Sequence, residues 1–169
     1  MAGCIDLRFG DESGFSLLPS VPYGWSKVGE QLGIQSSRSV RINVFGLLNL
    51  GGELTSFVTE KAMRSQTIID CLDSFAETIE KMTVVVLDNA PWHISKKIEE
   101  KIKQWEEKGV IIFYLPSYSP HLNIIETLWR KMKLEWLKPK DYKNKKNYKR
   151  RYKIFSKIME IRTTTLTSQ

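Results

Sequence analysis

The stretch Thr83-Val-Val-Val-Leu-Asp-Asn-Ala-Pro-Trp-His93 decides the fold of this chain. Its first five residues are β-branched or aliphatic without a break, which is typical of a central strand covered on both faces. Asp88 ends the apolar run, and Asn89 and Pro91 then mark a turn. The stretch therefore predicts a central strand that delivers a carboxylate to one edge of a sheet.

The periodicity on either side of this stretch predicts the remaining elements. Alternating or continuous apolar runs indicate strands over residues 5–9, 39–50, 53–59 and 110–115, with a turn at Gly51-Gly52. Apolar residues at helical spacing indicate helices over residues 65–81, 95–108 and 123–137. Three strands followed by alternating helices and strands predict an α/β fold. Its mixed sheet has five strands, three antiparallel and extended by parallel ones, with helices on both faces.

The charge of the chain is concentrated near its C-terminus. The net charge is +7 over 169 residues, and residues 138–153 contain a single acid, Asp141. We therefore expect one domain over residues 1–137, which is large enough for a catalytic domain. A basic, partly helical tail is expected over 138–169. The tail suits DNA phosphates, and a solvated tail without a partner is the alternative. The basic residues predicted to bind DNA are Lys138, Lys140, Lys143, Lys145, Lys146, Lys149, Arg150, Arg151 and Lys153.

Several classes of protein are excluded by composition. The apolar runs are too short to span a membrane, and the charged N-terminal residues do not form a signal peptide. Cys4 and Cys71 have neither metal-site nor disulfide spacing, so we expect a reducing, cytoplasmic environment.

Three acids in separate segments suggest the chemistry. Asp11 follows the first predicted strand, Asp88 follows the central strand, and Glu126 lies at the start of the last predicted helix. Carboxylates at the ends of neighbouring strands meet at one edge of a sheet. Such hard oxygen ligands favour Mg²⁺, or Mn²⁺ in its place, and two ions held in this way cut and join phosphodiesters.

Each acid also has a purely structural explanation. Asp11, in Asp-Glu-Ser-Gly, is typical of a turn, and Asp88-Asn89 before a proline is typical of a cap and turn. Asn123 and Glu126 have the spacing of a capping box, in which the acid bonds back to the amide of the cap residue.

Three motifs together resemble a known family. They are Asp-Glu-Ser-Gly-Phe at 11–15, Asp-Asn-Ala-Pro-Trp-His at 88–93, and Leu-Pro-x-Tyr-Ser-Pro-x-Leu-Asn-x-Ile-Glu-x-Leu-Trp at 115–129. The chain resembles the DDE transposases of the mariner superfamily, in their bacterial insertion-sequence branch. This resemblance implies an RNase H-like fold in which Asp11, Asp88 and Glu126 form the catalytic, metal-binding triad. It implies DNA nicking and strand transfer with two Mg²⁺ or Mn²⁺ ions.

The resemblance also implies neighbours of the triad and partners of the chain. His93 is expected to support the site, although a turn histidine with satisfied bonds is an equal alternative, and Asn89 is expected to orient Asp88 or its loop. DNA ends and target DNA are the expected partners, in a homodimer at the bacterial nucleoid. Family members carry an N-terminal helix-turn-helix region that this sequence lacks, so we expect either a separately encoded catalytic half or a truncated remnant. A remnant that only binds DNA, or another RNase H-like nuclease, is the alternative function.

Overall fold

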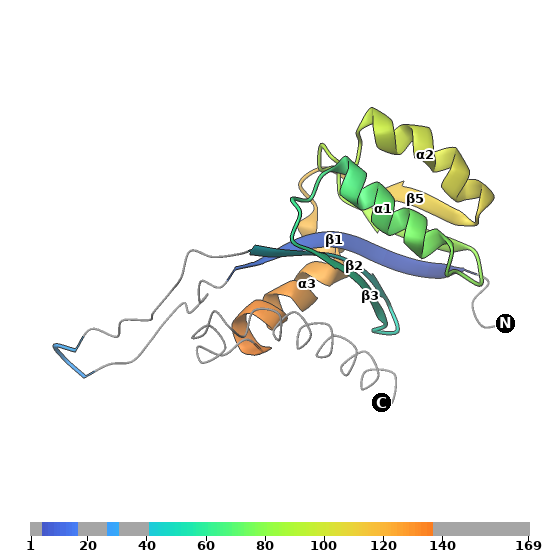
Figure 1. The fold of residues 1–169 in the computed structure, drawn as a ribbon. Helices are drawn as coiled ribbons and strands as arrows, with labels where there is room; N and C mark the ends of the chain where they lie inside the picture. The colour runs from blue at the N-terminus through green and yellow to red at the C-terminus, as the bar shows by residue number, and fades with distance from the viewer. Residues whose placement is uncertain (1–4, 17–26, 31–40, 137–169) are drawn as a thin grey trace.

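One mixed sheet of five strands forms the centre of the protein (Figure 1). The computed structural model describes residues 5–16, 27–30 and 41–136. The strand order is β3-β2-β1-β4-β5; β1 is antiparallel to β2 and β2 to β3, whereas β4 is parallel to both β1 and β5. This arrangement confirms the predicted sheet. The strands are β1 (Asp6–Ser16), β2 (Arg41–Asn49), β3 (Leu54–Thr59), β4 (Thr83–Leu87) and β5 (Val110–Tyr114).

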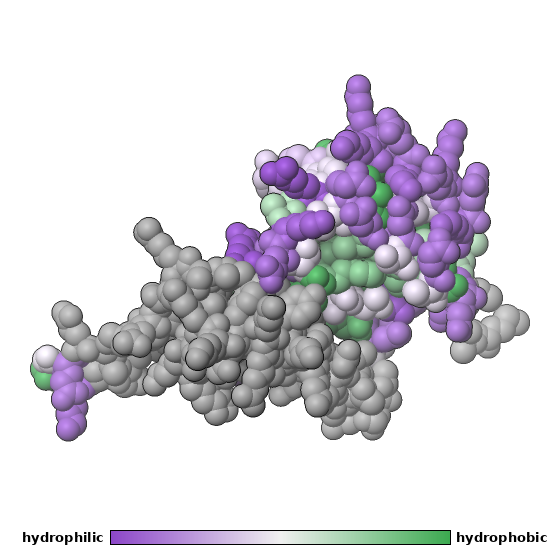
Figure 2. All heavy atoms as spheres, in the orientation of Figure 1, coloured by the Kyte–Doolittle hydropathy of each residue, from purple (hydrophilic) through white to green (hydrophobic). Residues whose placement is uncertain are grey.

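Helices cover both faces of the sheet. α1 (Ser65–Ala76) and α2 (Lys96–Glu107) lie on one face, and α3 (Ile124–Lys131) lies on the other (Figure 1). A short 3-10 helix, Pro120–Leu122, leads into α3, and a π-helical turn, Met132–Trp136, follows it. The outward sides of α1 and α2 are hydrophilic (Figure 2), as amphipathic helices on a sheet require. In the ranges that the structure describes, no helix is long and apolar enough to cross a membrane.

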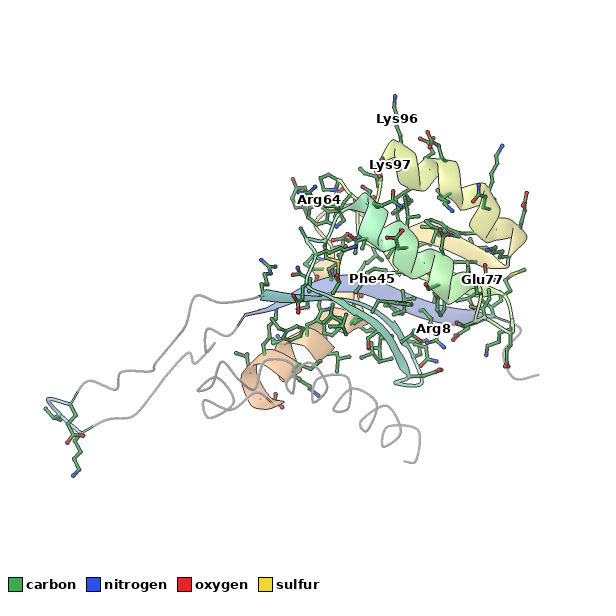
Figure 3. The ribbon with its side chains drawn as sticks, in the orientation of Figure 1. Arg8, Phe45, Arg64, Glu77, Lys96 and Lys97 are labelled. Carbon is green, nitrogen blue, oxygen red and sulfur yellow. The ribbon has the colours of Figure 1, made fainter. Side chains whose placement is uncertain are left out.

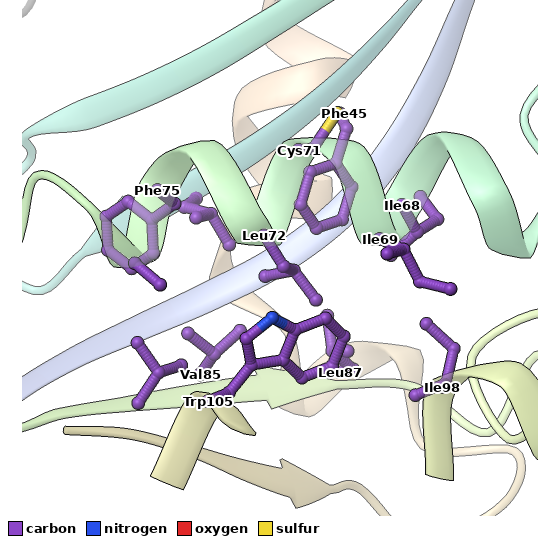
Figure 4. Close-up of a cluster of buried hydrophobic side chains, with 13 residues drawn as sticks. Phe45, Ile68, Ile69, Cys71, Leu72, Phe75, Val85, Leu87, Ile98 and Trp105 are labelled. Atoms are coloured by element: carbon purple, nitrogen blue, oxygen red, sulfur yellow. The ribbon is translucent and has the colours of Figure 1, made fainter. Parts of the chain in front are cut away.

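The larger core lies between the sheet and the two helices α1 and α2 (Figure 4). Phe45 and Leu47 of β2, Leu72 of α1 and Trp105 of α2 are almost completely buried there. Each such side chain stabilises the fold by about 1.5–3 kcal/mol. Trp105 also donates a hydrogen bond from Nε1 to Asp73 Oδ1 at 2.8 Å, which joins α2 to α1.

A buried arginine, Arg8, connects the N-terminal part of β1 to β3 and to α1 (Figure 3). Arg8 of β1 is 7% exposed and donates to Asp6, to Thr55 and to Glu53 at 2.6, 3.0 and 2.9 Å. Its guanidinium also lies 5.5 Å from the centre of the Phe75 ring. Each of the three guanidinium nitrogens thus has a hydrogen-bond partner, so the cluster is a structural connection between β1, β3 and α1.

The smaller core seats α3 on the opposite face. Val44 and Leu48 of β2 face the side of the sheet opposite to Phe45 and Leu47. They pack with Ile125 and Trp129 of α3. Gly46 lies between them, and a Cβ built there would stand 2.7 Å from the Trp129 ring. The missing side chain therefore allows α3 to approach β2 closely.

Three predicted boundaries are corrected by the structure. The first strand runs to Ser16 instead of ending at residue 9, because β2 supplies ladder partners from Arg8 to Ser16 despite two glycines. Asp11 therefore lies inside β1, opposite Gly46, and not in a loop after it. The helix predicted over 65–81 ends at Ala76, and Arg64 is its N-cap in place of Ser65. The basic residues of 138–153 lie outside the described residues.

The predicted turn at Gly51-Gly52 is confirmed, and a further glycine, Gly109, separates two other elements. Gly52 and Gly109 have φ values of 84° and 90°, in the left-handed region that glycine adopts without strain. Gly52 closes the turn between β2 and β3, and Gly109 separates α2 from β5.

Candidate active site

The register of two parallel strands brings two of the acids together. β1 pairs with β4 from Asp6↔Thr83 to Phe9↔Val86. Two residues further in the same register, Asp11 is level with Asp88. β4 ends at Leu87, so Asp88 leaves the sheet where β1 continues. The two carboxylates therefore come from neighbouring strands at the same edge.

The third acid arrives on α3, which one asparagine attaches to β1. Asn123 is 3% exposed, and its Nδ2 donates to the carbonyl of Gly10 at 3.1 Å. Its Oδ1 caps α3 by accepting from the amide of Ile125 at 3.4 Å. Glu126 follows within the first turn of the helix. The start of α3 is thus fixed beside the residue that precedes Asp11.

Two surface cavities meet at Glu126. One cavity, of about 350 Å³, is lined by Asp88, by Glu126 and by residues of the loop from Leu115 to Asn123. The other, of about 360 Å³, is lined by Asp11, Glu12 and Ser13 of β1, by Glu126 and by further residues of α3 and the π-helical turn. Glu126 lines both, so the structure brings all three predicted acids to one edge of the sheet.

The surroundings of Asp11 raise its pKa. Burial, the adjacent Glu12, and the charges of Asp88 and Glu126 together raise the pKa of Asp11 to about 7, against a lowering by the Glu12 backbone. Like charges held so close favour a cation or a proton among them. In the part of the chain that the structure describes, no three His, Cys, Asp or Glu side chains already surround a common metal position. The donor chemistry nevertheless fits Mg²⁺ or Mn²⁺, since carboxylate oxygens are their preferred protein ligands.

His93 lies completely buried behind Asp88. Its Nδ1 is 2.7 Å from Asp88 Oδ1, and its Nε2 is 2.8 Å from Glu12 Oε1. Burial alone would lower the pKa of His93, but the bonds to Asp88 and Glu12 outweigh it and raise the pKa to about 9. The ring is therefore an imidazolium at neutral pH and donates to both carboxylates. The same bond, as its largest cause, lowers the pKa of Asp88.

Asp88 serves as a turn residue as well. Its Oδ1 accepts from the amide of Ala90 at 3.1 Å, which is the structural role considered for it. The carboxylate is 52% exposed, and its Oδ2 has no hydrogen-bond partner among the residues that the structure describes. The turn therefore holds one oxygen and leaves the other facing solvent.

The neighbouring Asn89 and the candidate capping box also have clear positions. Asn89 Nδ2 donates to the carbonyl of Leu115 at 2.7 Å, so it ties the loop after β4 to the end of β5. The amide of Asn123 donates to Pro120 O at 2.9 Å, which occupies the donor that a capping box would offer to Glu126. The Glu126 side chain is exposed instead.

Sequence reasoning missed three residues of this region. Glu12 accepts hydrogen bonds from both Trp92 Nε1, at 2.9 Å, and His93. Arg130 and Lys133 line the cavity with Asp11. Their spacing of four and seven residues from Glu126 on one helix was the signal that could have revealed them. Glu12 gave no such signal, because its partners lie 80 and 81 residues away.

A family model described as "DDE superfamily endonuclease" matches residues 6–149 of the chain. This chain belongs to that family. The match includes the whole described sheet and the positions of all three acids, so the fold reported above is that of a DDE superfamily endonuclease domain.

The DDE domain is similar to one curated protein and to solved transposase structures. It is 31% identical, over 61 residues, to the "Uncharacterized protein y4pE/y4sA" of Sinorhizobium fredii, and this match covers 36% of the chain and 41% of that protein. The Mos1 mariner paired end complex with Mn has a TM-score of 0.62 at 10% identity, over 96% of this chain and 52% of the Mos1 chain. The complex with Mg has a TM-score of 0.61 at 12% identity, over the same shares.

These structural likenesses establish the fold of the DDE domain. It is the RNase H-like fold of transposase catalytic cores, as predicted. The chain spans about half the length of the Mos1 chain and less than half of the curated relative.

Proposed function

We propose that this chain carries the catalytic domain of a DDE transposase. Such a domain cuts one DNA strand at the end of a mobile element and then joins the freed 3′-hydroxyl to target DNA. The observation that carries the proposal is the convergence of Asp11, Asp88 and Glu126 at one sheet edge, in a chain of the DDE endonuclease family. The catalytic unit is proposed to span residues 1–137, with 138–169 as its basic tail.

Asp11, Asp88 and Glu126 are the residues that would hold two Mg²⁺ or Mn²⁺ ions. When bound, divalent ions activate water for attack on phosphorus and stabilise charge on the leaving oxygen. Two observations support this role. Burial, Glu12 and the charges of Asp88 and Glu126 raise the pKa of Asp11 to about 7, and the similar Mos1 complexes are described with Mn and with Mg.

The residues around the triad have supporting tasks. The bond from His93 orients Asp88, and Asn89 fixes the loop on which Asp88 lies. Arg130 and Lys133 stand beside Asp11 and Glu126, where a DNA phosphate would pass during the reaction. Lys133 is well suited to this task, because its Nζ lies 5.4 Å from the centre of the Phe15 ring and is held near the site.

DNA is the proposed partner, as both element end and target, in a homodimeric complex in the bacterial cytoplasm. The similar Mos1 structures are paired end complexes, and the curated relative is bacterial. The basic residues of 138–153 would extend the contacts that Arg130 and Lys133 begin, since Lys and Arg neutralise phosphates and release counterions.

Nicking of DNA that contains an element end tests the proposal. The wild-type protein should cut one strand in the presence of Mg²⁺ or Mn²⁺ and not after chelation of the metal. Asp88→Asn is the matched variant, because it keeps the shape and the turn but removes the charge. Equal nicking by Asp88→Asn would contradict the proposal, and DNA binding without nicking by the wild type would favour a remnant that only binds DNA.

A further inference from the structure

A continuous chain of hydrogen bonds links β1 to the loop after β4 behind the triad. It runs from Glu12 Oε1 to His93 Nε2 over 2.8 Å, and from His93 Nδ1 to Asp88 Oδ1 over 2.7 Å. No main-chain ladder joins the two segments here, because β4 has ended at Leu87. The side chains of Glu12 and His93 thus carry the connection past the end of the parallel pairing.

The histidine in this chain is held on every side. It is 0% exposed, its amide donates to Ala90 O at 2.8 Å, and its carbonyl accepts from the Tyr114 hydroxyl at 2.8 Å. Rotation of the buried ring would break the hydrogen bonds of both ring nitrogens, to Asp88 and to Glu12. Such bonds are costly to leave unmade when buried. The fixed position of the His93 ring therefore fixes the orientation of the Asp88 carboxylate.

Two successive carboxylates of β1 face opposite sides of the sheet. Gly10 faces the larger core, since a Cβ there would meet Leu87 and Leu47. Glu12 lies on the same side by the period of the strand, and Asp11 lies on the other side with Phe15 of the smaller core. Trp92 Nε1 also donates to Glu12 Oε1, at 2.9 Å, so this oxygen accepts from both Trp92 and His93. Both acids line the cavity beside Glu126, but this oxygen of Glu12 is engaged by Trp92 and His93.

We propose that Glu12 is a positioning residue that fixes the Asp88 carboxylate, through His93, in the orientation needed to bind metal. This inference rests on the proposed function, in which Asp88 is a metal ligand. Glu12 itself acts through the hydrogen-bond chain and does not contact the ion. Outer groups of this kind orient the ligands of a metal site, and their removal weakens metal binding by about 10- to 100-fold.

Calorimetric titration of the metal-free protein with Mn²⁺ tests the inference without any measurement of activity. Glu12→Ala removes the acceptor for both His93 and Trp92, and Glu12→Gln keeps the shape and one acceptor oxygen. We expect the Kd for Mn²⁺ to rise by about 10- to 100-fold in Glu12→Ala and by less in Glu12→Gln, with the number of bound ions unchanged. Glu107→Gln, an exposed acid at the end of α2, is the matched control and should bind as the wild type does.

The outcomes separate the two proposals. If the wild type binds Mn²⁺, Asp88→Asn loses it and both Glu12 variants bind normally, the positioning role is wrong and the triad stands. Loss of a bound ion in the Glu12 variants would make Glu12 a ligand and would also overturn the inference. If the wild type fails to bind Mn²⁺ at all, the metal-dependent function is wrong as well. Should Glu12→Ala not fold, Glu12→Gln alone decides, since unchanged affinity in it contradicts the inference.

Discussion

The side-chain amide of Asn123 donates to the carbonyl oxygen of Gly10 over 3.1 Å, across a sequence separation of 113 residues. The same side chain caps α3 through its oxygen. One residue therefore sets both the start of the helix that carries Glu126 and the distance of that helix from Asp11. The triad consequently depends on a contact in which none of its members takes part.

Substitution of Asn123 should separate these two roles. Asn123→Asp keeps the capping oxygen but removes the donor to Gly10, and Asn123→Ala removes both. We expect Asn123→Ala to lower the free energy of unfolding by about 1–3 kcal/mol, because it loses a cap and leaves a buried carbonyl unpaired. Urea unfolding measures this change. Equal stability of Asn123→Ala and wild type would contradict the double role.

The close approach of α3 to β2 depends on Gly46. In Gly46→Ala the new methyl group would stand 2.7 Å from the Trp129 ring, so the helix must move outward. We expect a loss of about 1–3 kcal/mol in the free energy of unfolding, as is usual for overpacking. Gly51→Ala is the control, since its nearest neighbour is the Asn49 side chain at 3.3 Å in an exposed turn. If the two variants are equally stable, the packing described for α3 is wrong.

The burial of Asp11 close to other acids should make the metal-free protein less stable as pH rises. The pKa of Asp11 is raised from 3.8 to about 7 on folding, so the folded state binds more protons than the unfolded state between these values. The stability is therefore present at low pH and lost as pH rises towards about 7. Asp11→Asn should match the wild type near pH 4 and exceed it near pH 8, by on the order of 1–2 kcal/mol.

Unfolding of both proteins in chelator across this pH range is the measurement. The difference between them isolates Asp11, because His93, whose pKa is raised to about 9, is present in both. A variant that is less stable than the wild type near pH 8 would show that burial and neighbouring charge do not raise the pKa of Asp11.

Arg130 and Lys133 should contribute to DNA affinity through charge. Replacement of either by alanine removes one phosphate contact, so the slope of log affinity against log salt should become shallower by about 1. Lys103→Ala is the matched control, an exposed cation on α2 at the opposite face of the sheet. Fluorescence anisotropy at several salt concentrations measures the slopes. Identical slopes in all three variants would remove these residues from the DNA surface.

The elements that sequence predicted best are those whose signal is local. Thr83–Leu87 is a continuous apolar run, and its bounds agree with β4. β1 was predicted too short, since Gly10 and Gly14 read as breaks, whereas the pairing with β2 that overrides them joins distant segments. The three acids were predicted by motif. Glu12 was missed because its role depends on a histidine 81 residues away.

The central claim is that Asp11, Asp88 and Glu126 share divalent cations. A crystal structure of the protein soaked in Mn²⁺, with the ions located by their anomalous scattering, tests it most directly. The account predicts anomalous density bounded by oxygens of these three side chains, with the Asp88 oxygen that His93 does not engage among the ligands. Manganese bound elsewhere, with the three carboxylates free of it at saturating concentration, would contradict the account.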